Sequence, residues 1–208
     1  MLTFFRLRHR AQKINGFLGD LYLLKKRSGQ LAVLGNFGIG SPVVASLADE
    51  LAAWGVNRLV LLSLAGGLQP TLQPGDIVIG ERAVRDEGAS YHYLPPARYV
   101  EASPGLVAEL AAALTQRHLQ PTVGTTWSTD APYRESWIEV EQLQAEGVQT
   151  VDMESGGLFA VGQARGIETA SVFVVGDSLA SPRWTAPPDM RRLHQKLKTV
   201  LNILIKVV

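Results

Sequence analysis

The chain has 208 residues, of which 46% are hydrophobic and 19% charged, so it is large enough to bury the core of a globular protein. Its 20 Lys and Arg nearly balance its 19 Asp and Glu, which argues against a nucleic-acid partner, and the absence of cysteine excludes disulfides and thiolate metal sites. The 4 histidines show no metal-ligand spacing and no run of about 18 apolar residues occurs, so we expect a cytoplasmic protein with no metal, no membrane partner and no cleavable leader.

The first local feature is a basic cluster formed by Arg6, Arg8, His9, Arg10 and Lys13. One interpretation is a solvated N-terminal arm, because charged side chains are usually exposed. The other is an anion contact, which can extend into a neighbouring subunit. These residues alone leave both interpretations open.

Strand and helix patterns alternate along the rest of the chain. Short apolar runs predict buried strands at 31–34, 58–62, 77–79, 121–126 and 170–175. Apolar residues at helical spacing predict helices at 42–54, 104–118, 136–146, 154–165 and 188–207. This alternation predicts an α/β fold, a single domain over residues 1–208 whose central β-sheet has helices on both faces.

In such folds, ligands bind beyond the carboxyl ends of the strands. The segments expected there are 35–42, 63–67, 85–93, 126–134 and 176–181, joined by 152–155 just ahead of a helix. The polar residues and glycines of these segments are therefore the candidates for ligand binding.

Glycines dominate segment 35–42, between a predicted strand and a helix. Gly38 and Gly40 either serve a tight turn sterically or let backbone N–H groups approach an anion or a sugar at the helix N-terminus. The segment does not match the phosphate-binding or dinucleotide-binding motifs.

Two acidic positions each allow two interpretations. Glu154 stands at a helix start, where it either caps the helix or accepts hydrogen bonds from two vicinal sugar hydroxyls with its two oxygens. Asp177 ends a buried strand, where it either caps the next segment or donates a proton in a dry pocket.

Six blocks in one order carry a family resemblance. They are 38–42 with 50–51, 65–70 with 75–79, 84–93, 128–133, 152–155 and Asp177. Together they resemble the nucleoside phosphorylase family, which contains purine and uridine phosphorylases and nucleosidases. The resemblance implies a mixed central β-sheet and chemistry at C1′ of a nucleoside, where phosphate or water replaces the base.

The resemblance also implies roles for individual residues. Glu154 would bind the 2′- and 3′-hydroxyls, Met153 would pack on the ribose, and Asp177 would be the catalytic donor to N7 of a purine. Asp130 and Tyr133 would lie beside the base.

Other implications concern the backbone and the partners. Gly38, Gly40 and Gly66 would form loops near the sugar or an anion. The partners would be a nucleoside or nucleobase and further copies of the chain, as a dimer or hexamer. No cofactor is implied, although inorganic phosphate is a possible co-substrate.

The phosphate site departs from the family pattern. Leu61 stands at the place of a phosphate-binding Arg, and Leu64 at the place of a phosphate-binding hydroxyl. No Arg stands near Asn15, where the family takes one from a neighbouring subunit, and the family's N-terminal strand with its phosphate loop has no counterpart. Three hypotheses follow: a phosphorylase, a nucleosidase that uses water, and a non-catalytic nucleoside-binding relative.

Overall fold

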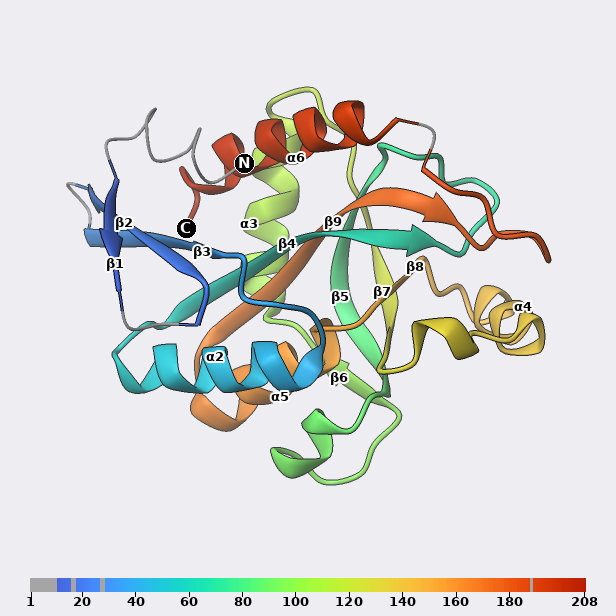
Figure 1. The fold of residues 1–208 in the computed structure, drawn as a ribbon, viewed down its shortest axis with the longest axis horizontal. Coiled ribbons are helices and arrows are strands. Elements are labelled where there is room, and N and C mark those ends of the chain that lie inside the picture. Colours follow the sequence, from blue (N-terminus) through green and yellow to red (C-terminus); the bar gives the residue numbers. More distant parts are fainter. Residues whose placement is uncertain (1–10, 16–17, 27–28, 188) are drawn as a thin grey trace.

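A computed structural model describes residues 11–15, 18–26, 29–187 and 189–208 (Figure 1). Of the basic cluster, Arg6, Arg8, His9 and Arg10 lie outside the described residues. Lys13 lies within them and forms an ion pair with Asp20. Within the described ranges, no helix is long and apolar enough to cross a membrane.

A small antiparallel sheet contains β1 (Gln12–Ile14), β2 (Asp20–Lys26) and β3 (Gly29–Gly35). It packs on the C-terminal end of the last helix through a cluster that includes Tyr22, Leu31 and Ile205. The sequence analysis predicted only part of β3 among these three strands.

The larger sheet has the strand order β6-β5-β7-β8-β4-β9. Its strands are β4 (Arg58–Gly67), β5 (Ile77–Asp86), β6 (Tyr99–Glu101), β7 (Thr122–Thr129), β8 (Thr150–Asp152) and β9 (Glu168–Ser178). Parallel pairs join β4 to β9, β5 to β7 and β7 to β8, and the other pairs are antiparallel. The predicted mixed sheet is therefore confirmed.

This sheet closes on itself, because β5 pairs with β9 as well as with β7. The strands β5, β7, β8, β4 and β9 thus form a ring. Along β9, Val172 and Val174 face a core shared with helices, whereas Phe173 and Val175 face a smaller cluster with Val78. The two-residue period of the strand therefore divides β9 between an outer and an inner core.

Five α-helices and two short 3-10 helices are described. They are α2 (Ser41–Ala53), α3 (Pro104–Thr115), α4 (Trp137–Ala145), α5 (Ser155–Arg165) and α6 (Met190–Leu204), with η1 (Ala89–His92) and η2 (Pro132–Arg134). Residues of α2, α3, α5 and α6 share one core on the outer face, and α4 covers another part of the sheet with Trp127 and Leu143 (Figure 1). The expected helices on both faces are present.

Helix boundaries shift where capping residues decide them. The predicted helix at 188–207 begins at Met190, because the Asp189 carboxylate accepts hydrogen bonds from the N–H groups of Arg191 and Arg192. The predicted helix at 104–118 ends at Thr115, ahead of His118 at φ 59°.

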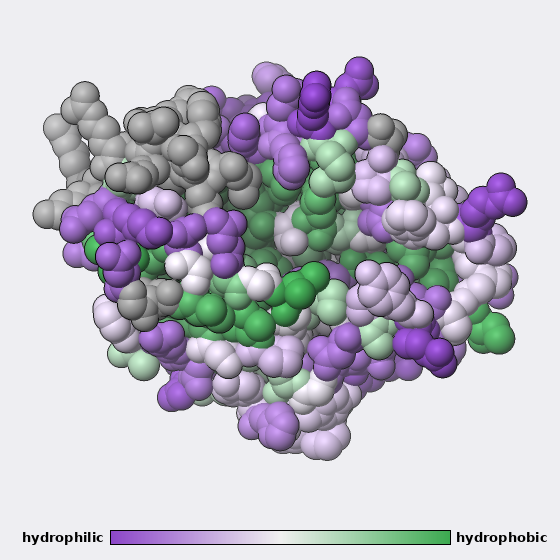
Figure 2. All heavy atoms as spheres, in the orientation of Figure 1, coloured by the Kyte–Doolittle hydropathy of each residue, from purple (hydrophilic) through white to green (hydrophobic). Residues whose placement is uncertain are grey.

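An apolar groove of about 1100 Å³ lies between the small sheet, α2, β4 and α6. Figure 2 shows apolar side chains gathered in this hollow. Among the described strands, β3 pairs only with β2, and β4 pairs only with β9 and, at its end, with β8. Side-chain packing rather than strand pairing therefore joins the small sheet to the ring.

Candidate functional site

Glu154 is the buried carboxylate around which the site is organised. It is the N-cap residue of α5, and its Oε1 accepts a 2.7 Å hydrogen bond from the backbone N–H of Gly40, the N-cap residue of α2. Its Oε2 accepts a 3.3 Å bond from the N–H of Met153. The predicted residues Met153, Glu154 and Gly40 are therefore brought together.

The two helix N-termini meet closely because glycines face them. A Cβ on Gly157 would lie 3.0 Å from Cβ of Ser41, and the N–H of Gly157 donates to Ser41 Oγ at 3.3 Å. Gly40 has φ 98°, a conformation that favours glycine. Two interpretations of the glycines in segment 35–42 were a tight turn and a contact with a sugar. The conformation of Gly40 is compatible with both.

Burial raises the pKa of Glu154, and the nearby Asp152 carboxylate raises it further, while the N–H of Gly40 opposes both effects. Asp152 is itself buried and accepts hydrogen bonds from Thr126 and Ser128 and from the N–H groups of Glu154 and Ser155, at 2.6 to 3.1 Å. Asp152 therefore acts as the structural cap and sets the backbone position of Glu154.

Asp177 lies near the end of β9, beside Gly66 of β4. Its Oδ2 accepts a 2.6 Å hydrogen bond from the indole N–H of Trp184, and a Cβ on Gly66 would lie 3.6 Å from its Oδ1. The same Cβ would lie 2.9 Å from Cγ1 of Val151, two residues before Met153. The predicted Asp177 and Gly66 therefore lie at the same end of the sheet as the Glu154 group.

Glu135 joins Asp177 as a second carboxyl group, although the sequence analysis did not select it. It is half-buried between η2 and α4, and burial together with the negative charge of Asp177 raises its pKa to about 7. No hydrogen bond contributes to that shift within the described part of the chain. A carboxyl group of this kind holds a proton near neutral pH.

The two expected base contacts occupy different surroundings. Asp130 Oδ2 accepts a 2.8 Å hydrogen bond from the N–H of Gly88, so this side chain ties together two loops at the end of the sheet. Tyr133 in η2 is 100% exposed, so its ring does not enclose a base-binding site in this structure. Both roles stay predictions, and that of Tyr133 needs the ring to fold over a bound ligand.

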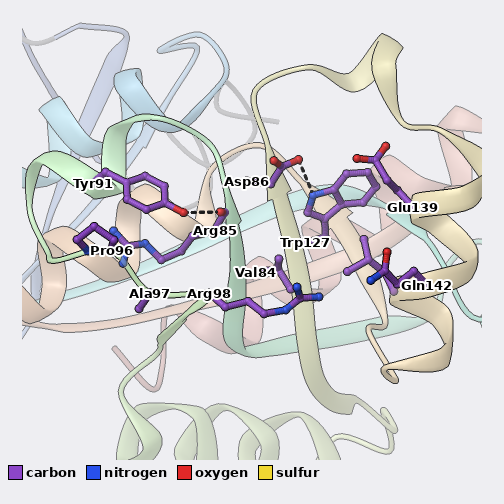
Figure 3. A pocket seen from close by; sticks show the side chains of 11 residues that line it. Val84, Arg85, Asp86, Tyr91, Pro96, Ala97, Arg98, Trp127, Glu139 and Gln142 are labelled. Carbon is purple, nitrogen blue, oxygen red and sulfur yellow. Dashed lines mark hydrogen bonds between the residues drawn. The ribbon is translucent and has the colours of Figure 1, made fainter.

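The loop that follows β5 is held by Arg85 rather than left free for a ligand. Arg85 donates to Ser90 Oγ and to the carbonyl of Pro95, both at 2.8 Å, and it stacks on the ring of Tyr91. Figure 3 shows Arg85 and Tyr91 beside a cavity of about 540 Å³, where the indole N–H of Trp127 donates to Asp86 at 3.0 Å. Arg85 therefore has a structural role.

The two positions that depart from the family pattern are apolar in their surroundings as well. Leu61 and Leu64 are partly buried and pack against the main core, and Leu61 also contacts the inner core. A phosphate dianion needs charge-assisted donors, which these side chains lack. Gly38, at φ 104°, and Gly40 form the turn into α2, and the N–H of Gly40 is already donated to the carboxylate of Glu154.

Comparison with known proteins agrees with this geometry. A family model described as the phosphorylase superfamily matches residues 9–207. The chain is 30% identical to a uridine phosphorylase of Haemophilus influenzae over 159 residues, which is 70% of this chain and 63% of that protein.

Two further relatives are purine enzymes by name. The chain is 25% identical to a guanosine phosphorylase of Halorubrum lacusprofundi over 170 residues, which is 82% of this chain and 70% of that protein. It is 26% identical to a DeoD-type purine nucleoside phosphorylase of Bacillus cereus over 203 residues, 92% of this chain and 83% of that protein. The chain thus spans less than two thirds of the uridine phosphorylase and more of the purine enzymes.

Proposed function

Because the chain belongs to the phosphorylase superfamily, we propose that it cleaves the N-glycosidic bond of a nucleoside and transfers the pentosyl group to phosphate. The relatives named uridine, guanosine and purine nucleoside phosphorylase support this reaction class. They also leave both purine and pyrimidine nucleosides as substrate classes. We also propose a homo-oligomer as the working form, which the resemblance of the sequence to this family implies.

The observation that carries the proposal is the buried carboxylate of Glu154 at the meeting point of α2 and α5. Each of its oxygens accepts one backbone N–H and retains acceptor capacity. Two vicinal hydroxyls of a ribose are donors of matching number and spacing. The proposal therefore assigns Glu154 to the 2′- and 3′-hydroxyls and Met153 to the sugar face.

The reaction requires groups that stabilise the charges developing on the leaving base and at C1′ as the bond breaks. The C1′–N bond breaks, its electron pair goes to the base, and an oxygen of phosphate forms the new bond at C1′. The proposal assigns Asp177, whose Oδ2 accepts a hydrogen bond from the indole N–H of Trp184, as the polar partner of the leaving base.

Hydrolysis is a second candidate, and Leu61 and Leu64 favour it. Their apolar packing removes the side-chain donors that a buried phosphate dianion needs. Water carries no charge and does not need them. In that reaction the oxygen of water, rather than that of phosphate, would bond to C1′.

One assay separates these functions. Base release is measured for a panel of purine and pyrimidine nucleosides, with and without inorganic phosphate. Release only with phosphate supports the phosphorylase, and release that is independent of phosphate supports the nucleosidase. Binding without release under either condition would overturn both and leave a non-catalytic nucleoside-binding protein.

A further inference from the structure

The indole of Trp184 contacts Asp177, the carboxyl group that the proposed reaction assigns to the leaving base. Its Nε1–H donates a 2.6 Å hydrogen bond to Oδ2 of Asp177. Trp184 is 59% exposed, so burial of its ring does not explain where the side chain lies. In the part of the chain that the structure describes, Oδ1 of Asp177 accepts no hydrogen bond. The two oxygens of this carboxyl group therefore have different surroundings.

The backbone explains why Trp184 reaches Asp177. Ser178 and Thr185 form an antiparallel bridge, in which their backbones exchange hydrogen bonds at 2.9 and 3.0 Å. Side chains alternate between the two faces of a strand, so Asp177 and Trp184 lie on the same face, diagonally across the bridge. Diagonal neighbours of this kind are within reach of a large aromatic side chain. The contact thus follows from the register of the bridge.

The loop that this bridge closes is fixed at further points. The N–H of Leu179 donates to the carbonyl of Gly67 in β4 at 2.9 Å. The N–H of Ala180 donates to Oγ of Ser178 in β9 at 3.2 Å. Trp184 therefore approaches the carboxyl group on a loop that is tied to two strands of the ring.

The chemistry of the indole decides which oxygen of Asp177 carries a proton. An indole N–H can only donate, so it requires an acceptor oxygen. In a protonated carboxyl group the carbonyl oxygen is the better acceptor, so the indole at Oδ2 favours the proton on Oδ1. Oδ1 lies 3.6 Å from the place where a Cβ on Gly66 would stand, so no side chain covers it at this point.

We propose that Trp184 is a positioning residue for the proton transfer. Its indole keeps Oδ2 of Asp177 as an acceptor and directs the proton to Oδ1, from which the leaving base receives it. This inference rests on the proposed function and deepens it, because it identifies the oxygen that acts as the acid and the residue that orients it.

The transfer balances as follows. As the C1′–N bond breaks, its electron pair moves onto the base, and the proton on Oδ1 moves to a ring nitrogen of that base. An oxygen of phosphate or water bonds to C1′, and an attacking water loses a proton to solvent. The indole N–H of Trp184 then donates to a carboxylate, and such charge-assisted bonds are stronger than neutral ones. Trp184 therefore also stabilises the form of Asp177 that the transfer produces, before solvent returns a proton to it.

The first test is kinetic and compares the wild type with Trp184→Phe, which retains an aromatic ring but has no N–H. For the nucleoside with the fastest base release, we expect kcat to fall at least about 10-fold and KM to stay within about 3-fold, because the lost bond acts on the acid and not on the sugar. In Trp184→Gln, the amide nitrogen stands as far along the side chain as the indole nitrogen, so kcat should return to within about 3-fold of the wild type. Trp54→Phe, the same change at a residue that is 69% exposed at the end of α2, is the matched control and should retain the wild-type values.

The second test follows the indole N–H of Trp184 by NMR in the free protein, which needs no turnover. Its loss in Trp184→Phe assigns the signal. In Asp177→Ala the signal should move upfield and exchange faster with solvent, because its acceptor is gone. The indole signal of Trp127, which donates to Asp86, should stay unchanged.

A change of the Trp184 signal together with the loss in kcat supports the proposal. An indole signal that does not respond to Asp177→Ala, or a Trp184→Phe variant with the wild-type kcat, would overturn it. A wild type that releases no base under any condition overturns the proposed function and, with it, the catalytic role of Trp184. The NMR signal still decides in that case whether the indole and the carboxyl group are in contact.

Discussion

The backbone N–H of Gly40 donates a 2.7 Å hydrogen bond to Oε1 of Glu154, which lies 114 positions further along the chain. This bond joins the first residue ahead of α2 to the first residue ahead of α5. The carboxylate is consequently held by two segments that have no local sequence relationship. Its position depends on the packing of the two helices as much as on the motif around Met153.

Replacing Glu154 with Ala should weaken nucleoside binding by at least about 10-fold, because two charge-assisted hydrogen bonds to the sugar are lost. Binding is measured by calorimetry with a nucleoside and, separately, with its free base. The base should bind about equally to both proteins, since it carries no ribose. Unchanged affinity for the nucleoside would show that the sugar contact is wrong.

Replacing Asp177 with Asn should slow base release by about 100-fold or more, because the amide cannot exchange a proton with the leaving base as the proposed carboxyl group does. The rate is followed by the absorbance change of the released base. Asp49→Asn, which changes a surface ion pair with Arg165, is the control and should retain the wild-type rate. Equal rates for the Asp177 variant and wild type would remove this residue from the mechanism.

Gly66→Ala should lower the free energy of unfolding by about 1 to 3 kcal/mol, because the new Cβ would lie 2.6 Å from Cδ1 of Leu179 and 2.9 Å from Cγ1 of Val151. Urea denaturation measures the change. Gly105→Ala is the matched control on α3, where no heavy atom lies within 4 Å of the added Cβ. The control should be neutral or more stable by up to about 1 kcal/mol; equal destabilisation of the two variants would contradict the steric argument.

Glu135 should also make stability depend on pH. Its pKa is about 7 in the folded chain against an ordinary 4.5, so the folded state binds the proton more tightly than the unfolded state. The stabilisation is complete below pH 4.5 and is lost as the pH rises through 7. Since solvent still reaches this group, we expect a loss of about 1 to 2 kcal/mol across that interval.

Urea denaturation at several pH values compares the wild type with Glu135→Gln. The difference between their unfolding free energies should change over this interval and be constant above it. The raised pKa of Glu154 acts with the same sign in both proteins and cancels in the comparison. A difference that is constant from pH 4 to 8 would contradict the predicted titration.

The regular helices and the central strands could be predicted because their apolar residues follow one clear period. The strand at 77–79 was predicted too short, since β5 continues to Asp86 through polar residues that face β6 and β7. The short β8 (Thr150–Asp152) was missed because three residues carry no periodic signal. Its pairing partners, which define it, are distant in the sequence.

The site was predictable only where a local motif marks it. Glu154 stands in such a motif, and the structure adds the contact with Gly40. Glu135 has no comparable motif, and its raised pKa comes from burial and from the charge of Asp177, a residue distant in the sequence. The sequence could not predict that Asp177 acts on Glu135, because these residues approach each other only when η2 and β9 come together in the fold.

The closed ring of β5, β7, β8, β4 and β9 has a consequence for how the molecule opens. A ring has no terminal strand that can detach while the others remain paired, so its amide hydrogens should exchange with solvent through one cooperative event. The small sheet lies outside that ring and is joined to it by side chains alone in the described residues, so it can open at lower free energy. The protein thus combines a single cooperative unit, which carries both Asp177 and Gly66, with an independently opening flap of three strands.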